Sequence, residues 1–195
     1  NKSFKPTILS VTFQPGMSCC IPLEHPEAHD YVDSKWDWKK QLSKFGHEVI
    51  ENPSIVKVSW NGKFDFQIFE LYDIYYRGTM LDGMLAKYVL NEERPNDLKS
   101  MVARYIPESA GYESNKGFDR LPWDQKPFEP LCQYGGQDTD YTLRLMIFFE
   151  KKLIDNKLYS LYRNMIMPAS RVLQSVESKG LYLDRAFNTK LLEEY

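Results

Sequence analysis

Tyr134 and Asp138 stand four residues apart in the stretch YGGQDTDYTLRL, with Gly135 and Gly136 between them. Residues four apart lie on one face of a helix, so this spacing would point a phenol and a carboxylate toward the same place. The two glycines would let a ligand approach the backbone closely. In the structural alternative, Asp138 favours the first turn of a helix that begins near residue 135, and Tyr134 packs at the edge of the core. The pair alone leaves both interpretations open.

A second carboxylate, Asp65, follows Asn61 in the stretch NGKFD, directly after a short apolar run at residues 55–58. Ligand-binding groups in open α/β sheets gather at the carboxyl ends of the strands, so a strand-to-helix junction is a place where chemistry is expected. The structural alternative is an Asn-Gly turn followed by a surface aspartate. This motif is also ambiguous by itself.

The hydrophobic pattern predicts the elements that must position these residues. Alternating apolar residues at 7–22, with a turn at Pro15-Gly16, predict a β-hairpin, and residues 55–58 predict a further strand. Residues 107–130, which are rich in proline, predict a long loop. Helical spacing predicts helices at 34–49 (with Ser34 and Asp37 as a capping box), 64–75 (with Phe64, Ile68, Leu71 and Tyr75 on one face), 81–90, 96–105, 135–155 and 157–178, the last ending at Gly180. Strands followed by helices indicate an α/β layer with a helical extension.

Composition narrows the classes of partner. The 195 residues carry 25 Lys and Arg against 27 Asp and Glu, so a nucleic-acid partner would be met by a local patch or through bound metal ions. No stretch is long and apolar enough to span a bilayer, and no signal peptide is visible, so we expect no membrane partner. The cysteines Cys19, Cys20 and Cys132 lack a metal-type spacing and indicate buried thiols in a reducing compartment.

Taken together, these motifs resemble the 3′→5′ exonuclease domain of family A DNA polymerases, over nearly the whole chain. The matching pieces are ILSVTFQPGMSCCIPLEH, NGKFD, LDGMLAKYVLN, DLKSMVARY and YGGQDTDYTLRL, and LYRNMIMPASRVLQSVESKGLYLD resembles the family's bridge into the polymerase domain. The resemblance implies a ribonuclease H-like α/β fold with a mixed sheet and flanking helices. It places an exonuclease domain at residues 1–156 and the helical start of a polymerase domain at 157–195. We expect a monomeric, cytoplasmic protein of a bacterium or of a phage-infected cell.

The resemblance also implies a site in which four carboxylates hold two Mg²⁺ ions, with Mn²⁺ as a substitute, and hydrolyse the terminal phosphodiester of a single-stranded DNA 3′ end. Asp65 and Asp138 correspond to two of the four metal-binding carboxylates, and Tyr134 to the residue that orients the attacking water. Asn61 and Phe64 would contact the terminal nucleotide. Arg94 would reach a phosphate.

One motif of the family is missing. The family carries Asp-x-Glu on a strand just upstream of the hairpin, and no such strand is present in this sequence. Two carboxylates leave about two of the positive charges of two Mg²⁺ ions uncompensated, so the sequence holds half of a metal site. We therefore expect the parent protein to carry this strand about ten residues before Asn1, and residues 1–195 alone to be nearly inactive. The alternatives are a catalytically inactive exonuclease-like scaffold, and an RNA exonuclease of the ribonuclease D type.

The remaining candidates favour structural roles. His25 and His29 have a metal-type spacing, but Pro26 interrupts the helix that this spacing needs and no third ligand is evident. Trp36, Trp38 and Trp60 could stack on bases, and core packing is the better interpretation of each. Asp82 and Asp140 lie near the motifs, and we interpret them as supporting residues.

Overall fold

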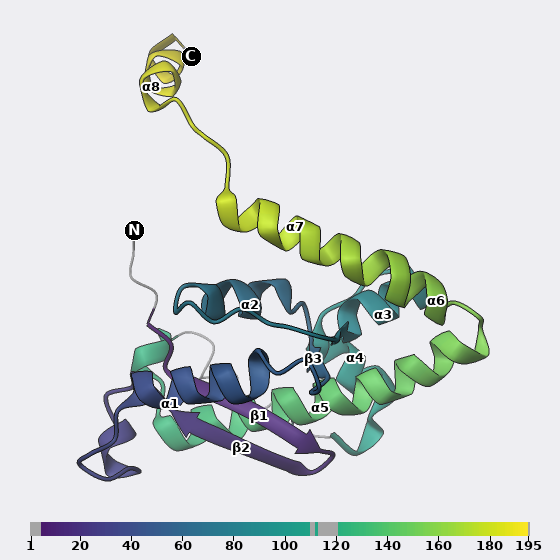
Figure 1. Ribbon diagram of the computed structural model, residues 1–195, viewed down its shortest axis with the longest axis horizontal. Helices are drawn as coiled ribbons and strands as arrows, with labels where there is room; N and C mark the ends of the chain where they lie inside the picture. Colours follow the sequence, from purple (N-terminus) through teal and green to yellow (C-terminus); the bar gives the residue numbers. More distant parts are fainter. Residues whose placement is uncertain (1–4, 110–111, 113–120, 195) are drawn as a thin grey trace.

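The chain folds into two small pairs of strands held by helices (Figure 1). The computed structural model describes residues 5–109, 112 and 121–194. Its strands are β1 (Ile8–Gln14), β2 (Met17–Pro22), β3 (Lys57–Ser59) and β4 (Met80–Asp82). Its helices are α1 (Trp38–Phe45), α2 (Lys63–Glu70), α3 (Gly83–Leu90), α4 (Leu98–Tyr105), α5 (Phe128–Asp155), α6 (Tyr159–Leu161), α7 (Met167–Lys179) and α8 (Arg185–Glu194). Short 3-10 turns lie at Ala28–Asp30, Pro107–Ser109 and Trp123–Gln125, and π-helical turns at Gly46–Ile50 and Tyr162–Ile166.

The predicted hairpin is confirmed. β1 and β2 pair in antiparallel register from Ile8 opposite Pro22 to Gln14 opposite Met17. Gly16 has a φ of 81°, in the left-handed region that glycine adopts without strain. The Pro15-Gly16 turn was therefore readable from residue type.

The second pair of strands differs from the prediction. β3 runs over Lys57–Ser59 instead of residues 55–58. It pairs in parallel with β4, whose last two residues lie at the start of the helix predicted at 81–90. β4 has only three residues and runs directly into α3, so it gives no separate periodic signal. The described strands thus form an antiparallel pair and a parallel pair as separate sheets, not one continuous mixed sheet.

Helix α1 begins later than predicted. Its N-cap is Asp37, whose side chain accepts hydrogen bonds from the backbone nitrogens of Lys39 at 3.1 Å and Lys40 at 3.3 Å. The proposed capping box with Ser34 is wrong, because Asp37 occupies the capping position itself. A π-helical turn then follows the helix from Gly46 to Ile50.

Helix α2 is shorter than predicted and turns a different face to the core. It ends at Glu70, and Asp73 has a φ of 58°, so the chain leaves the helix before Tyr75. Phe66 is the buried residue of α2, whereas Phe64 and Leu71 are exposed. The predicted helical face is wrong because the helix ends before Tyr75 and packs Phe66 into the core, where its ring centroid lies 4.6 Å from that of Tyr76.

Helix α5 organises the molecule. It packs against both hairpin strands, β3, α3 and α4, so it joins the two strand pairs, as Figure 1 shows. It begins at Phe128, seven residues before the predicted start at 135. Within the predicted loop at 107–130, residues 110–111 and 113–120 lie outside the described part of the chain.

The region predicted as one helix at 157–178 is divided by the π-helical turn at Tyr162–Ile166. α7 ends at Gly180, which has a φ of 68°, so the predicted C-cap is confirmed. Tyr162 is fully buried: its hydroxyl accepts from the backbone nitrogen of Asp82 at 2.6 Å and donates to the backbone oxygen of Asp82 at 3.0 Å. This contact fixes the C-terminal helices to the end of β4. None of the helices that the structure describes is both long and apolar enough to cross a membrane.

Candidate active site

The turn between β3 and α2 is held by a buried carboxylate. Asp82, at the end of β4, is only 1% exposed and accepts hydrogen bonds from the backbone nitrogens of Gly62 at 2.7 Å and Asn61 at 3.3 Å. It also caps α3 by accepting from the backbone nitrogen of Leu85 at 3.1 Å. Burial raises the pKa of Asp82, and these backbone donors oppose that effect. Asp82 therefore has the supporting role expected of it.

Asn61 and Asp65 project from this turn. Asn61 has a φ of 59°, a left-handed conformation that asparagine tolerates better than most residues, and its side chain is exposed. Asp65 reaches the molecular surface, yet protein atoms crowd its carboxyl group. This desolvation, together with the negative charge of Asp82, raises the pKa of Asp65 to about 7. Such a carboxylate lacks a compensating positive charge.

Asp138 lies on α5 among two phenols and an ammonium group. The Tyr112 hydroxyl donates a hydrogen bond to Asp138 Oδ1, and Tyr134 also forms a side-chain hydrogen bond with Asp138. Burial raises the pKa of Asp138, while these hydrogen bonds and the positive charge of Lys99 lower it. The Lys99 ammonium lies 5.7 Å from the centroid of the Tyr134 ring, and the Tyr112 and Tyr134 rings are nearly parallel at 6.3 Å. The helical spacing of Tyr134 and Asp138 thus brings them together as predicted.

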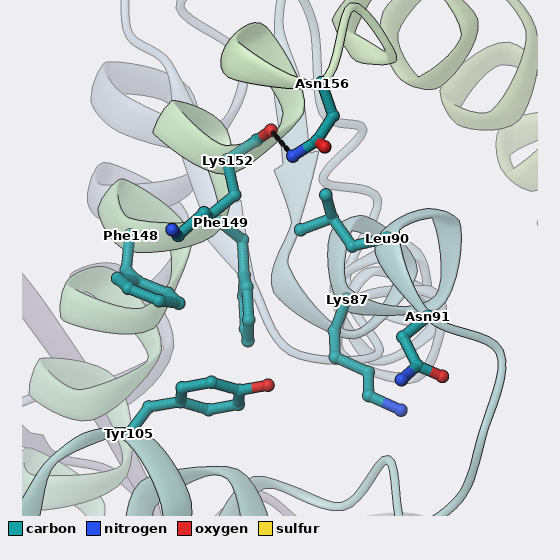
Figure 2. A pocket seen from close by; sticks show the side chains of 8 residues that line it. All are labelled: Lys87, Leu90, Asn91, Tyr105, Phe148, Phe149, Lys152 and Asn156. Atoms are coloured by element: carbon teal, nitrogen blue, oxygen red, sulfur yellow. Dashed lines mark hydrogen bonds between the residues drawn. The ribbon is translucent and has the colours of Figure 1, made fainter.

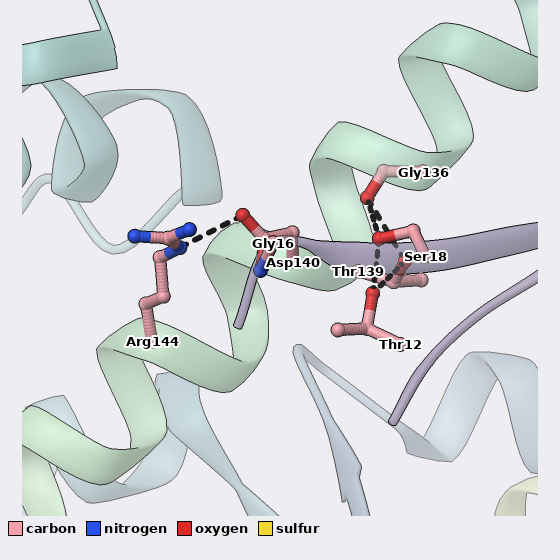
Figure 3. A network of polar contacts seen from close by, with 7 residues as sticks. All are labelled: Thr12, Gly16, Ser18, Gly136, Thr139, Asp140 and Arg144. Carbon is pink, nitrogen blue, oxygen red and sulfur yellow. Dashed lines mark hydrogen bonds and ion pairs between the residues drawn. The ribbon is translucent and has the colours of Figure 1, made fainter. Parts of the chain in front are cut away.

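Gly135 and Gly136 lie inside α5 and not at the predicted start of a helix, so the prediction that they open the helix to a ligand is wrong. A Cβ atom at Gly135 would collide with Ser10 Oγ of β1, and one at Gly136 would come within 3.4 Å of Ser18 Cβ in β2. The glycines therefore allow the hairpin to pack closely on the helix. Figure 3 shows the polar contacts beside them. The Ser18 hydroxyl donates to the backbone oxygen of Gly136 at 2.9 Å, and the Thr12 and Thr139 hydroxyls lie 2.8 Å apart.

Asp140 completes this contact between helix and hairpin. It accepts a hydrogen bond from the backbone nitrogen of Gly16 at 2.6 Å and forms an ion pair with Arg144 at 2.8 Å (Figure 3). The supporting role expected of Asp140 is therefore the one that the structure gives it.

Phe64 and Arg94 are placed on the surface. The Phe64 side chain, 59% exposed, stands one residue before Asp65 at the start of α2. Arg94 is exposed in the connection between α3 and α4 and forms no hydrogen bond or ion pair with another described residue. Their assignment to nucleotide and phosphate stays a prediction.

Neither motif carboxylate is among the groups that shift the pKa of the other. The charge that acts on Asp65 is that of Asp82, and the charge that acts on Asp138 is that of Lys99. Among the described residues no group of three or more His, Cys, Asp or Glu side chains could hold a metal ion. Carboxylate oxygens are suitable donors for Mg²⁺, but the number and grouping of the described carboxylates do not fit a two-ion site.

Sequence reasoning missed Tyr112 and Lys99, which both act on Asp138. Lys99 lies in the first turn of α4, and Tyr112 is one of several aromatic residues in the predicted loop at 107–130. Neither has a spacing relative to Tyr134 that a sequence pattern could reveal. Lys99 comes close to Asp138 through the packing of α4 against α5, and Tyr112 reaches Asp138 from the segment after α4.

Other candidate residues form structural contacts. A ring nitrogen of His25 lies 3.0 Å from the backbone oxygen of Lys126, and that of His29 lies 2.6 Å from the backbone oxygen of Pro26. The indoles of Trp36 and Trp60 donate to the backbone oxygens of Pro22 and Asn96, each at 3.1 Å.

A pocket of about 190 Å³ lies between α3, α4 and α5 (Figure 2). It contains none of the predicted site residues; its lining is Lys87, Leu90, Asn91, Tyr105, Phe148, Phe149, Lys152 and Asn156. The Lys87 ammonium is already bonded to the backbone oxygen of Glu93 and, at 2.6 Å, to Asn96 Oδ1. The pocket is therefore distinct from the candidate site around Asp65 and Asp138.

Comparison with known proteins places the motifs in a family. Residues 4–154 match the model of the 3′-5′ exonuclease of DNA polymerase A. DNA polymerase I of Borreliella burgdorferi is 27% identical over 184 residues, covering 92% of this chain and 19% of that protein. The DNA polymerase of Escherichia phage T5 is 31% identical over 183 residues, covering 83% of this chain and 21% of that protein. The chain thus spans about a fifth of the length of these relatives.

A solved structure supports the fold. The POL domain of Pol1 from M. smegmatis, in complex with DNA primer-template and dNTP, superposes with a TM-score of 0.63 at 18% identity, covering 84% of this chain and 26% of that one. The family match covers both motif carboxylates and Tyr134. The chain therefore belongs to the 3′-5′ exonuclease family of family A DNA polymerases, and its α/β fold is the ribonuclease H-like fold of that family.

Proposed function

We propose that this chain is the proofreading exonuclease domain of a DNA polymerase, which removes mispaired nucleotides from the 3′ end of a single-stranded DNA primer. The observation that carries the proposal is the pair of motifs on α2 and α5: each presents an aspartate whose pKa is raised by its surroundings. Carboxylates in such surroundings gain the most from a bound cation, and perturbed carboxylates concentrate at functional sites.

The residues would take the roles that the resemblance to the family implies. Tyr134, which hydrogen-bonds to Asp138, would orient the attacking water, and the exposed Asn61 and Phe64 would contact the terminal nucleotide. Arg94 would bind a phosphate. Asp65 and Asp138 would be two of the Mg²⁺ ligands, with Mn²⁺ as a substitute. Because two carboxylates are too few to bind two Mg²⁺ ions, the remaining ligands would come from an Asp-x-Glu strand outside residues 1–195.

Residues 157–195 would lead into a polymerase domain of the same parent chain. α7 has exposed apolar side chains at Val172, Leu173 and Val176, which suit a helix that is covered by further protein. This bridge and the polymerase relatives favour a DNA substrate over the RNA substrate of a ribonuclease D-like enzyme. The inactive-scaffold alternative is disfavoured because Asp65, Tyr134 and Asp138 are retained together.

The test is digestion of paired and mismatched primers by the complete protein in Mg²⁺. We expect mismatched 3′ ends to be removed faster than paired ends, because a site that grips phosphates and stacks one base needs a frayed single strand. A complete protein that cleaves both at one rate, or that prefers RNA, would contradict the proofreading assignment. Absence of any cleavage would favour the inactive scaffold.

A further inference from the structure

Helix α2, which carries Asp65, is too short to be stable by itself. It has eight residues, and isolated helices of this length are not stable in water. Phe66 anchors one side of it in the core, and Asp82 holds the turn before it. The rest of its position must come from other contacts.

Phe69 of α2 stacks on the ring of Phe45, and further contacts come from α7 through hydrogen bonds donated in both directions. Glu177 of α7 accepts from Lys63 at 2.5 Å and from Gln67 at 3.4 Å. Glu70 of α2 accepts from Gln174 at 2.8 Å and from Ser178 at 2.9 Å. We call these six side chains the α2–α7 clamp. Figure 1 shows α7 running along the side of the molecule that carries α2.

The face of α7 that meets α2 is polar, although helices usually meet through apolar side chains. Gln174 is buried against α2, and Ser170, Gln174, Glu177 and Ser178 follow the helical spacing of one stripe, in which Met167 at the start of α7 is the buried apolar member. Arg171 extends the contact, with its guanidinium 4.7 Å from the centroid of the Tyr76 ring. Hydrogen bonds depend on direction as well as distance. The polar face of α7 therefore fixes the orientation of α2 in addition to holding it in place.

α7 also lies beyond residues 4–154, the part of the chain that matches the exonuclease family. The clamp therefore links the helix of Asp65 to a segment that the exonuclease match does not include.

We propose that the α2–α7 clamp positions Asp65 for the exonuclease reaction, so that the segment leading toward the polymerase domain sets the geometry of the nuclease site. The inference rests on the function proposed above. Lys63 and Gln67 stand two residues before and two residues after Asp65, so any rotation of α2 that moves Asp65 also stretches the bonds to Glu177. Lys63 and Glu177 are positioning residues and take no part in the chemistry.

A charge-swap experiment in the complete protein tests this proposal. Lys63→Glu and Glu177→Lys are made singly and together, and kcat and KM are measured on single-stranded DNA at saturating Mg²⁺. We expect each single variant to lower kcat about fivefold with KM changed less than twofold, and the double variant to return kcat to within about twofold of the wild-type value. Glu48→Lys, at an exposed position after α1, makes the same charge change away from the clamp and should leave both constants unchanged.

Amide hydrogen exchange of residues 63–70 supplies a readout that does not need activity. Exchange should be faster in each single variant and restored in the double variant. Single variants with wild-type kcat and exchange, or a double variant no better than the product of the singles, would overturn the clamp while leaving the proposed nuclease intact. If the wild-type protein cleaves no DNA but the exchange pattern appears, the proposed function fails and only the holding of α2 by α7 remains.

Discussion

The Asp65 carboxyl has a pKa of about 7 because crowding by protein atoms and the nearby Asp82 charge disfavour its ionised form. In an unfolded chain an aspartate titrates near 3.9. Between these two pH values the folded protein binds more protons than the unfolded chain, so the free energy of unfolding falls as pH rises from about 4 to about 7 and then levels off. Asp65 thus costs stability at neutral pH, as expected of a residue retained for function.

Asp65→Asn should remove this pH dependence. We expect the variant and the wild type to have similar stability near pH 4, and the variant to become progressively more stable than the wild type up to about pH 7. Thermal denaturation in EDTA across this range measures the difference. Asp155→Asn, at the exposed end of α5, is the matched control. A stability difference that does not change with pH would show that the pKa of Asp65 is not raised in the folded protein.

Asp138 and Tyr134 should differ in their importance for catalysis. Asp138→Ala, like Asp65→Ala, should lower exonuclease kcat of the complete protein by about 100-fold or more, because charge stabilisation is the largest contribution at such sites. Tyr134→Phe should retain more activity, since it keeps the ring contacts with Tyr112 and Lys99 and loses only the hydroxyl. Single-turnover cleavage measures the rates, and circular dichroism checks the fold. Equal losses in Tyr134→Phe and Asp138→Ala would refute this division of roles.

At the scale of elements, the contact between the hairpin and α5 depends on two glycines that are not equivalent. Gly135→Ala places a methyl group against Ser10 and within 3.0 Å of Ile8 Cδ1, and such overpacking costs ~1–3 kcal/mol. Gly136→Ala meets nothing nearer than 3.4 Å and gains up to about 1 kcal/mol of helix propensity. We therefore expect Gly135→Ala to lower the free energy of unfolding and Gly136→Ala to be neutral or stabilising. Urea denaturation measures both, and the opposite order would refute the packing role of Gly135.

These glycines also show where sequence reasoning reached its limit on the fold. A Gly-Gly pair is usually found at a helix end, so it predicted a helix start at 135, but the tertiary contact with Ser10 and Ser18 requires it in the third turn of α5. The hairpin was predictable because alternation and the Pro-Gly turn are local signals. β4 was not, because Met80–Asp82 is stabilised by contacts distant in sequence, namely pairing with a strand more than twenty residues earlier and hydrogen bonds with Tyr162.

The candidate site follows the same rule. Tyr134 and Asp138 were predictable as neighbours since one helix fixes their spacing, and Asp82 was correctly given a supporting role. Lys99 and Tyr112 reach Asp138 from other segments, and the side chain of α2 that packs into the core is Phe66, which the predicted helical face did not include. Contacts between elements were therefore the part that pattern and propensity did not supply.

At the scale of the whole molecule, α7 has two dissimilar faces. Its polar face is occupied by the α2–α7 clamp, whereas Val172, at 63% exposure, and Val176, at 54%, lie on the opposite face. An apolar stripe normally faces a core, so α7 is inverted relative to the usual pattern. This inversion suits a helix that lies between two domains, with its polar side on the exonuclease domain and its apolar side on the proposed polymerase domain.

Replacing Val172 and Val176 should therefore change stability little in residues 1–195 alone but lower it in the complete protein. In a protein limited to residues 1–195, Val172→Ser with Val176→Ser changes only exposed side chains, and the free energy of unfolding should move by less than about 0.5 kcal/mol. In the complete protein the same pair should lower the unfolding temperature by several degrees, because each fully buried valine contributes ~1.5–3 kcal/mol. Val56→Ser, at an exposed valine before β3, is the control that should be silent in both contexts. Calorimetry on the two proteins decides the matter: an equally small effect in both would mean that the apolar face of α7 stays in water and that α7 does not join two domains.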